Sequence, residues 1–305
     1  MFVHRRRGWE ISEHLVTPEA LVLARRSVLS GAAALAVAGI ARPAQAAPNP
    51  RYPAGRALTD ESDATTYNNF YEFGTDKSIW RAAQRLPTSP WQIEIAGMVD
   101  KPRTIDLDDL LKQVPVEERI YRHRCVEAWA MTVPWTGFPL AAFVKLAAPT
   151  SSAKFLTFES LVNPKVMPGV RSSYFTWPYI EGVTMQEAQN DMAFLVTGMY
   201  GKPVPKQDGA PIRLVLPWKY GFKSAKSIVK VTFTDKRPDT FWAQIQPDEY
   251  GFWANVNPAV PHPRWSQATE RLLGTDNRVP TEIWNGYGAF VADMYNDKKN
   301  ERLFV

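Results

Sequence analysis

Cys125 is the only cysteine in the chain, and this restricts how the fold can be held together. One cysteine cannot form an internal disulfide, so the fold must depend on a hydrophobic core. The chain has 305 residues, of which 45% are hydrophobic, which is enough for a sizeable core in one domain or two. An unpaired thiol is unusual in a protein that leaves the reducing cytoplasm. Cys125 therefore needs a specific explanation.

Residues 1–46 are predicted to be a signal peptide of the twin-arginine type. Arg25 and Arg26 precede a weakly apolar run over residues 31–40, and the sequence AQA at 44–46 provides a small-residue cleavage signal. The apolar run is shorter than the ~20 residues that span a membrane. A general secretion signal or a retained anchor is the alternative. The twin-arginine route predicts a periplasmic protein that is exported already folded around a cofactor.

The charge and histidine content argue against two classes of protein. The whole chain has a net charge of +5, and residues 1–46 carry six arginines against three glutamates, so the rest is near neutral. Without a basic stripe to follow phosphates, nucleic acid is not an expected partner. His123 and His262 are the only histidines after residue 46. A zinc site of the Cys/His kind is therefore not expected.

The pattern after residue 46 predicts an extended lead-in over 47–66 and a single catalytic domain over 67–305. Period-two alternation and β-propensity predict strands, and capping residues and i, i+3, i+4 spacing predict short helices. The sequence contains no G-x-G-x-x-G fingerprint, so a Rossmann unit is not expected. Such short elements indicate an α+β fold that is mostly β. The strands are expected over 91–95, 119–125, 155–159, 212–216 and 229–233, and the helices after Asp106, after Pro139, after Thr184 and over 264–273.

The surroundings of Cys125 leave two interpretations open. A free cysteine is often a small buried hydrophobe. However, Arg122, His123 and Arg124 would favour a thiolate, which attacks electrophiles or binds metals. In a strand over 119–125, Arg122 and Arg124 share one face, and His123 and Cys125 share the other. A thiol hydrolase with His123 as base is possible, but coordination to a soft metal would better protect an exported thiol from oxidation.

Glu127 would lie on the same face as Cys125 if the strand continued. A carboxylate close to a metal can relay protons, so Glu127 is a candidate for the proton path. The alternative is a solvated carboxylate, or one paired with a neighbouring arginine.

Six sequence blocks appear in a fixed order: YNNFYEFG at 67–74, RHRCVEAW at 122–129, PWTGFPL at 134–140, PWKYGFK at 217–223, DEYGF at 248–252 and HPRWSQATER at 262–271. Together they closely resemble the catalytic subunits of bacterial periplasmic protein-methionine-sulfoxide reductases. This family has the sulfite oxidase fold and carries molybdenum on a molybdopterin without an appended nucleotide. The resemblance extends over the chain from about Tyr67 to Val305.

The resemblance implies that Cys125 is the thiolate ligand of molybdenum, and that a set of polar residues binds the cofactor. A buried phosphate needs a guanidinium, an ammonium and backbone N–H groups. Two positions depart from the family pattern: Ser160 stands where the family often has Thr, and Asp208 where it often has Asn. The residues expected to bind the cofactor are Asn68, Tyr71, Glu72, Cys125, Ser160, Asp208, Arg213, Ser224, Ala225 and Lys226.

The resemblance also implies an activity and a partner. Reduced molybdenum would take the oxygen of methionine sulfoxide in oxidised proteins, and the aromatic residues Trp129, Trp135 and Tyr250 could form the rim of an accessible mouth. The chain has no haem or iron–sulfur motif, so electrons would come from a membrane-embedded haem partner that an otherwise monomeric, soluble enzyme visits. A sulfite oxidase, a cofactor-free thiol hydrolase and a non-catalytic periplasmic binding protein are the alternatives.

Overall fold

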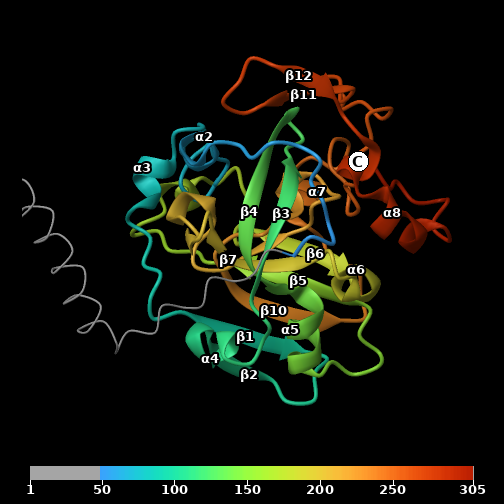
Figure 1. The fold of residues 1–305 in the computed structure, drawn as a ribbon. Helices are drawn as coiled ribbons and strands as arrows, with labels where there is room; N and C mark the ends of the chain where they lie inside the picture. Colours follow the sequence, from blue (N-terminus) through green and yellow to red (C-terminus); the bar gives the residue numbers. More distant parts are fainter. Residues whose placement is uncertain (1–48, 305) are drawn as a thin grey trace, which may run out of the picture. The chain divides into compact units, whose positions relative to one another are not determined.

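The computed structural model describes residues 49–304 of the chain. The predicted signal peptide lies outside the described residues. Two β-sheets connected by short helices form the described part, in agreement with the predicted α+β, mostly β class (Figure 1). Within residues 49–304, no helix has the length and apolar character needed to cross a membrane.

The first sheet has five strands in the order β2-β1-β10-β5-β6. β1 and β10 are parallel, and the other neighbours are antiparallel. The predicted strands over 91–95, 155–159 and 229–233 are all found here. The strands are β1 (Gln92–Gly97), β2 (Arg103–Asp106), β5 (Phe155–Ser160), β6 (Ile180–Thr184) and β10 (Ile228–Thr234).

The second sheet contains the long β3–β4 hairpin at the centre of Figure 1. Its path is β12-β11-β4-β7-β8, with β3 on β4 and β9 on β7. The predicted strands over 119–125 and 212–216 correspond to β3 and β9. The strands are β3 (Glu117–Arg124), β4 (Trp129–Pro139), β7 (Phe194–Met199), β8 (Lys202–Pro203), β9 (Arg213–Val215), β11 (Thr269–Leu272) and β12 (Arg278–Pro280).

The helices are short and lie between the strands. The α-helices are α2 (Glu61–Thr66), α3 (Trp80–Ala83), α4 (Leu107–Leu111), α5 (Leu140–Ala147), α6 (Met185–Gln189), α7 (Phe241–Ile245) and α8 (Gly288–Val291). The 3₁₀ turns are η2 (Pro168–Arg171), η3 (Lys206–Asp208), η4 (Gly221–Lys223), η5 (Ile283–Gly286) and η6 (Ala292–Tyr295).

Local sequence signals explain why three of these helices begin where they do. The Asp106 side chain accepts a hydrogen bond from the Asp108 amide at the start of α4. Thr184 and Glu187 form the predicted reciprocal capping box of α6. α5 begins directly after Pro139 and buries one apolar face that includes Phe143. The signals at Asp106, Pro139 and Thr184 are therefore confirmed.

Two sequence expectations differ from the structure. The helix predicted over 264–273 is wrong, because residues 269–272 form β11, which pairs with both β4 and β12. Pairing between distant segments overrides the local helical spacing here. The lead-in over 47–66 is extended only in part, since its last six residues form α2. Tyr52 in this segment is buried against the domain.

The two lysines of the PWKYGFK block are structural. Lys219 Nζ lies 2.5 Å from Glu187 Oε1, and Lys223 Nζ lies 2.5 Å from Glu181 Oε2, with all four side chains buried. A buried charge is tolerated only when an opposite charge offsets the cost of removing it from water, and each of these lysines has such a partner. These pairs tie the segment before Ser224 to β6 and α6, and so fix the backbone that leads into the site.

Candidate active site

Cys125 lies in a tight turn between β3 and β4. The Cys125 amide donates to the Trp129 carbonyl at 2.9 Å, and the Ala128 amide donates to the Cys125 carbonyl at 3.1 Å. Ala128 has a φ of 61°, so the strand does not continue through Glu127 and that expectation is wrong. The turn nevertheless brings Glu127 Oε2 to 3.7 Å from Cys125 Sγ. The two side chains meet because the chain reverses, not because they share a strand face.

The arginines beside Cys125 do not activate its thiol. His123 and Cys125 line the same cavity, as predicted, whereas Arg122 and Arg124 do not. Arg124 Nε lies 2.7 Å from Glu270 Oε2, with both side chains fully buried, and Arg122 pairs with Glu282. Burial, reinforced by the charge of Glu127, raises the pKa of the Cys125 thiol to about 12. Without a bound metal, the thiol is therefore protonated at neutral pH.

Glu270 supports the turn that contains Cys125 through Arg124, so replacing Glu270 should lower the stability of the protein. Glu270 pairs with both Arg124 and Arg56, and Arg124 also donates to the Cys125 carbonyl. Glu270→Gln should lower the free energy of unfolding by about 3–5 kcal/mol, because it leaves a buried guanidinium without its counter-charge. Urea unfolding measures this.

The matched control is Glu94→Gln, because Glu94 lies 3.4 Å from Lys230 in an exposed pair. Its expected cost is below about 1 kcal/mol. Equal costs for the two variants would contradict the structural role of Glu270.

Glu127 is surrounded by donors. Lys77 Nζ lies 2.6 Å from Glu127 Oε2, and Asn69 Nδ2 and Trp129 Nε1 donate to the same oxygen at 3.1 and 3.0 Å. Burial opposes ionisation, but the hydrogen bonds from Lys77 and Trp129 prevail and lower the pKa of Glu127 below its ordinary value. At neutral pH, Glu127 is a carboxylate that can accept a proton. Its role in a proton path stays a prediction.

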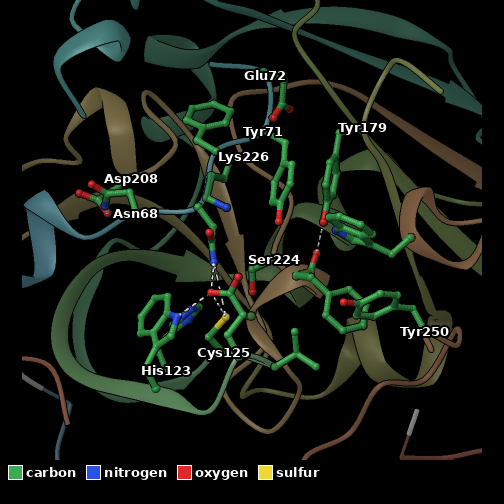
Figure 2. A pocket seen from close by; sticks show the side chains of 18 of the residues that line it. Asn68, Tyr71, Glu72, His123, Cys125, Tyr179, Asp208, Ser224, Lys226 and Tyr250 are labelled. Atoms are coloured by element: carbon green, nitrogen blue, oxygen red, sulfur yellow. Dashed lines mark hydrogen bonds between the residues drawn. The ribbon is translucent and has the colours of Figure 1, made fainter. Parts of the chain in front are cut away.

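A cavity of about 420 Å³ opens beside Cys125 (Figure 2). It contains ten of the eleven predicted site residues, although they come from β5, β9, η3, the turn between β3 and β4, and several loops. Ala225 is the exception, because it is fully buried and does not line the cavity, while its carbonyl accepts from the Leu214 amide. The ten residues are Asn68, Tyr71, Glu72, Cys125, Glu127, Ser160, Asp208, Arg213, Ser224 and Lys226.

His123 does not serve as a base for the thiol in this arrangement. The hydrogen-bond partners of Cys125 Sγ among the described residues are Asn69 and Glu127. Burial and the nearby charges of Arg213 and Lys226 hold the pKa of His123 well below its ordinary value, so the ring is neutral. A neutral imidazole that is not bonded to Sγ gives no support to a cysteine–histidine hydrolase.

The polar end of the cavity has two cations, of which Arg213 is buried and Lys226 is half-buried. At Gly209, whose φ is +104°, an added Cβ would lie 2.7 Å from the Lys226 side chain and 3.3 Å from Arg213 Cβ. Burial lowers the pKa of Arg213 to about 10, and burial together with the Arg213 charge lowers that of Lys226 to about 8. Two neighbouring cations partly removed from water favour an anionic ligand.

Several polar atoms around this cavity have no partner in the part of the chain that the structure describes. Buried polar atoms are nearly always hydrogen-bonded in native proteins, so these atoms indicate a polar ligand. A phosphate-bearing pterin fits both the cations and the unpaired groups. The atoms are Asn68 Oδ1, Ser160 Oγ, Asp208 Oδ2 and Arg213 Nη2.

Aromatic side chains line part of the cavity, but the three residues predicted for its rim are all buried. Trp129 and Tyr250 line the cavity, whereas Trp135 is fully buried beneath Arg213, whose Cζ lies 5.1 Å from its ring centroid. Tyr174 and Phe175, which the sequence reasoning missed, also line it, and Tyr174 is 65% exposed. The sequence offered no motif for these two residues, because they lie in an irregular loop.

Lys77 was also missed. It lies eight residues after Asn69 and donates to its side chain as well as to Glu127. Lys77 itself lies outside all six recognised sequence blocks. Only the three-dimensional contact links it to the cysteine turn.

Comparison with known proteins places these features in context. Residues 81–242 match the family model of the oxidoreductase molybdopterin binding domain. The chain is 46% identical over 319 residues to the protein-methionine-sulfoxide reductase catalytic subunit MsrP of Burkholderia mallei, covering 97% of this chain and 96% of the relative. It is 50% identical over 302 residues to MsrP of Xanthomonas campestris pv. campestris, covering 92% and 93%.

Among solved structures, the sulfane dehydrogenase SoxCD from Paracoccus pantotrophus matches with a TM-score of 0.42 and 20% identity. The match covers 50% of this chain and 40% of that one. At this level of similarity we draw no conclusion from it.

Proposed function

The chain belongs to the family of protein-methionine-sulfoxide reductase catalytic subunits, and from this premise we propose that it reduces methionine sulfoxide in oxidised proteins at the cavity beside Cys125. It is an oxidoreductase with a molybdopterin-binding domain. The observation that carries the proposal is a single cavity with a thiol in one wall and the cations Arg213 and Lys226 at its polar end.

The residues of the cavity fit molybdopterin in two ways. Arg213 and Lys226 would hold its phosphate, and Cys125 would supply the protein's sulfur ligand to molybdenum. When bound, the metal centre supplies two-electron oxygen-atom transfer with the sulfoxide. Coordination would remove the thiol proton that burial otherwise retains, and would protect this exported thiol from oxidation.

We propose that the cofactor carries no nucleotide on the phosphate that binds at the polar end of the cavity. Gln207 lines the cavity there and is hydrogen-bonded on both sides, accepting from Gln84 Nε2 at 3.0 Å and donating to the Thr65 carbonyl at 2.8 Å. This hydrogen-bonded side chain at the polar end is the support for a cofactor that ends in its phosphate.

The side chains around Cys125 would orient the reacting groups. Lys77, Asn69 and Trp129 hold Glu127 as a carboxylate beside Sγ, where it can accept or pass on a proton. Asn69 Nδ2, 3.5 Å from Sγ, adds a donor to the same wall. The exposed Tyr174 and the neighbouring Phe175 leave an apolar entrance that suits a methionine sulfoxide side chain carried on a polypeptide.

Location and electron supply follow from the sequence as proposals. The twin-arginine pattern before residue 46 supports export to the periplasm. Cys125 is the only cysteine of the whole chain, and no C-x-x-C-H motif is present. Electrons would therefore come from another protein, for which a membrane-embedded haem subunit is proposed.

Turnover assays separate this function from its nearest alternative. The protein is purified from a molybdenum-replete host and supplied with a reduced dye and an oxidised, methionine-sulfoxide-containing protein. We expect dye oxidation and return of the thioether, measured by mass spectrometry, with no oxidation of sulfite. Sulfite oxidation without sulfoxide turnover would favour a sulfite oxidase instead.

A further inference from the structure

Asp208 is a buried carboxyl group in the polar end of the cavity, and one of its oxygens is unpaired. Its Oδ1 accepts a hydrogen bond from Asn68 Nδ2 at 2.7 Å, and its own backbone carbonyl accepts from Arg213 Nη1 at 2.8 Å. Its Oδ2 has no partner among residues 49–304. Figure 2 shows Asp208 and Asn68 together, away from Cys125. The carboxyl group is thus held in place on one side and open to a ligand on the other.

The same end of the cavity attracts an anion. The Arg213 guanidinium is not hydrogen-bonded to the Asp208 carboxyl group. Its Nη1 donates to the Asp208 backbone carbonyl, and its Nη2 has no partner among the described residues. Lys226 packs beside Arg213 at Gly209. An anion bound to these cations would lie close to Asp208, and two anionic groups cannot share a buried site without a proton between them.

We propose that Asp208 and the anionic end of the bound cofactor share one proton, so that the cofactor is held tightly only while that proton is present. This inference rests on the proposed function, because it takes the phosphate of molybdopterin as the ligand. It makes Asp208 a specificity-determining residue that accepts a phosphate with a proton and discriminates against a fully ionised one.

The charged groups around Asp208 determine the pH range over which its carboxyl group loses its proton. Arg213 from β9 and Lys226 after η4 favour its ionised form, Asn68 donates to it, and Tyr200 after β7 lies within electrostatic range. Glu72 lines the same cavity and interacts with Lys226; burial also raises its pKa to about 7, and it is unchanged in both proteins compared below. Burial outweighs these influences and raises the pKa of Asp208 from 3.8 to about 7 in the free protein. A raised pKa stabilises the folded protein at low pH, and this contribution is lost as pH rises through about 7.

The test measures release of the cofactor from the holoenzyme of wild type and of Asp208→Asn. The amide has the same shape and can donate to the phosphate, but it does not titrate. Loaded proteins are passed into buffers between about pH 6 and 9, and the pterin and molybdenum that remain bound are quantified. Both proteins are also made in a Lys226→Arg background, because arginine keeps its charge over this range and removes any effect of Lys226 titration.

Wild type should lose affinity for the cofactor about tenfold more for each pH unit above 7 than Asp208→Asn, in which only the groups common to both proteins, such as Glu72, still titrate. Infrared spectra of the loaded wild type should contain a protonated-carboxyl band that Asp208→Asn lacks. Identical pH profiles would overturn the inference, as would faster release from Asp208→Asn than from wild type at the highest pH, which would mean that an ionised Asp208 accepts N–H groups from the cofactor. Wild type without any pterin would overturn the proposed function itself.

Discussion

Cys125→Ser is expected to lower the rate of protein-bound methionine sulfoxide reduction by more than about 100-fold, since loss of a supporting residue around a metal costs about 10–100-fold and loss of the ligand should cost more. The proposed phosphate-binding residues Arg213 and Lys226 are unchanged in this variant, so the pterin should remain bound. The variant therefore separates loss of the sulfur ligand from loss of the cofactor. Activity and pterin content are measured on the same preparation.

X-ray absorption at the molybdenum edge gives the direct readout for this variant. Wild type should have one more sulfur neighbour than Cys125→Ser. The matched control is Cys125→Ala, which removes the possibility that the serine hydroxyl replaces the thiolate. Activity of both variants within tenfold of wild type would contradict the role of Cys125 as ligand.

Arg213→Met is the second change with a large expected effect. Arg213 is fully buried in the cavity, and its Nη2 has no partner among the described residues. Removing one partner of a buried, hydrogen-bonded charge pair costs about 2–5 kcal/mol, or at least about 30-fold in affinity. We therefore expect purified Arg213→Met to contain little pterin. Fluorescence of the oxidised pterin measures the content.

Arg213→Lys is the control for this prediction. It keeps the positive charge but loses the paired N–H groups, so its pterin content should lie between wild type and Arg213→Met. Thermal unfolding of the cofactor-free forms checks that both variants fold. Full pterin content in a folded Arg213→Met would show that the phosphate does not bind at this end.

Local signals in the sequence were enough to place many elements. The caps at Asp106 and Thr184 are satisfied within a few residues of the chain, and so they work wherever the helix packs. The alternation of apolar and polar residues that predicts β1 and β10 is also a local signal, because it requires only that one face of each strand is buried. β11 was mistaken for a helix, because its pairing with β4 joins segments about 140 residues apart.

The residues of the candidate site could be predicted from the sequence for a different reason. Nine of the ten residues that the family resemblance supplied line the cavity, although they are far apart in sequence. What the sequence could not supply was their electrostatic state. Arg122 and Arg124 looked like activators of Cys125, but both are neutralised by distant carboxylates. Lys77 reaches Glu127 only because the chain folds back.

We propose that the cavity beside Cys125 holds molybdenum on a phosphate-bearing pterin. The most direct test is the stoichiometry of molybdenum and pterin phosphate in the mature protein purified from a molybdenum-replete host. The account predicts about one of each per chain, with no nucleotide released on hydrolysis of the cofactor. A folded protein containing neither molybdenum nor pterin would contradict it.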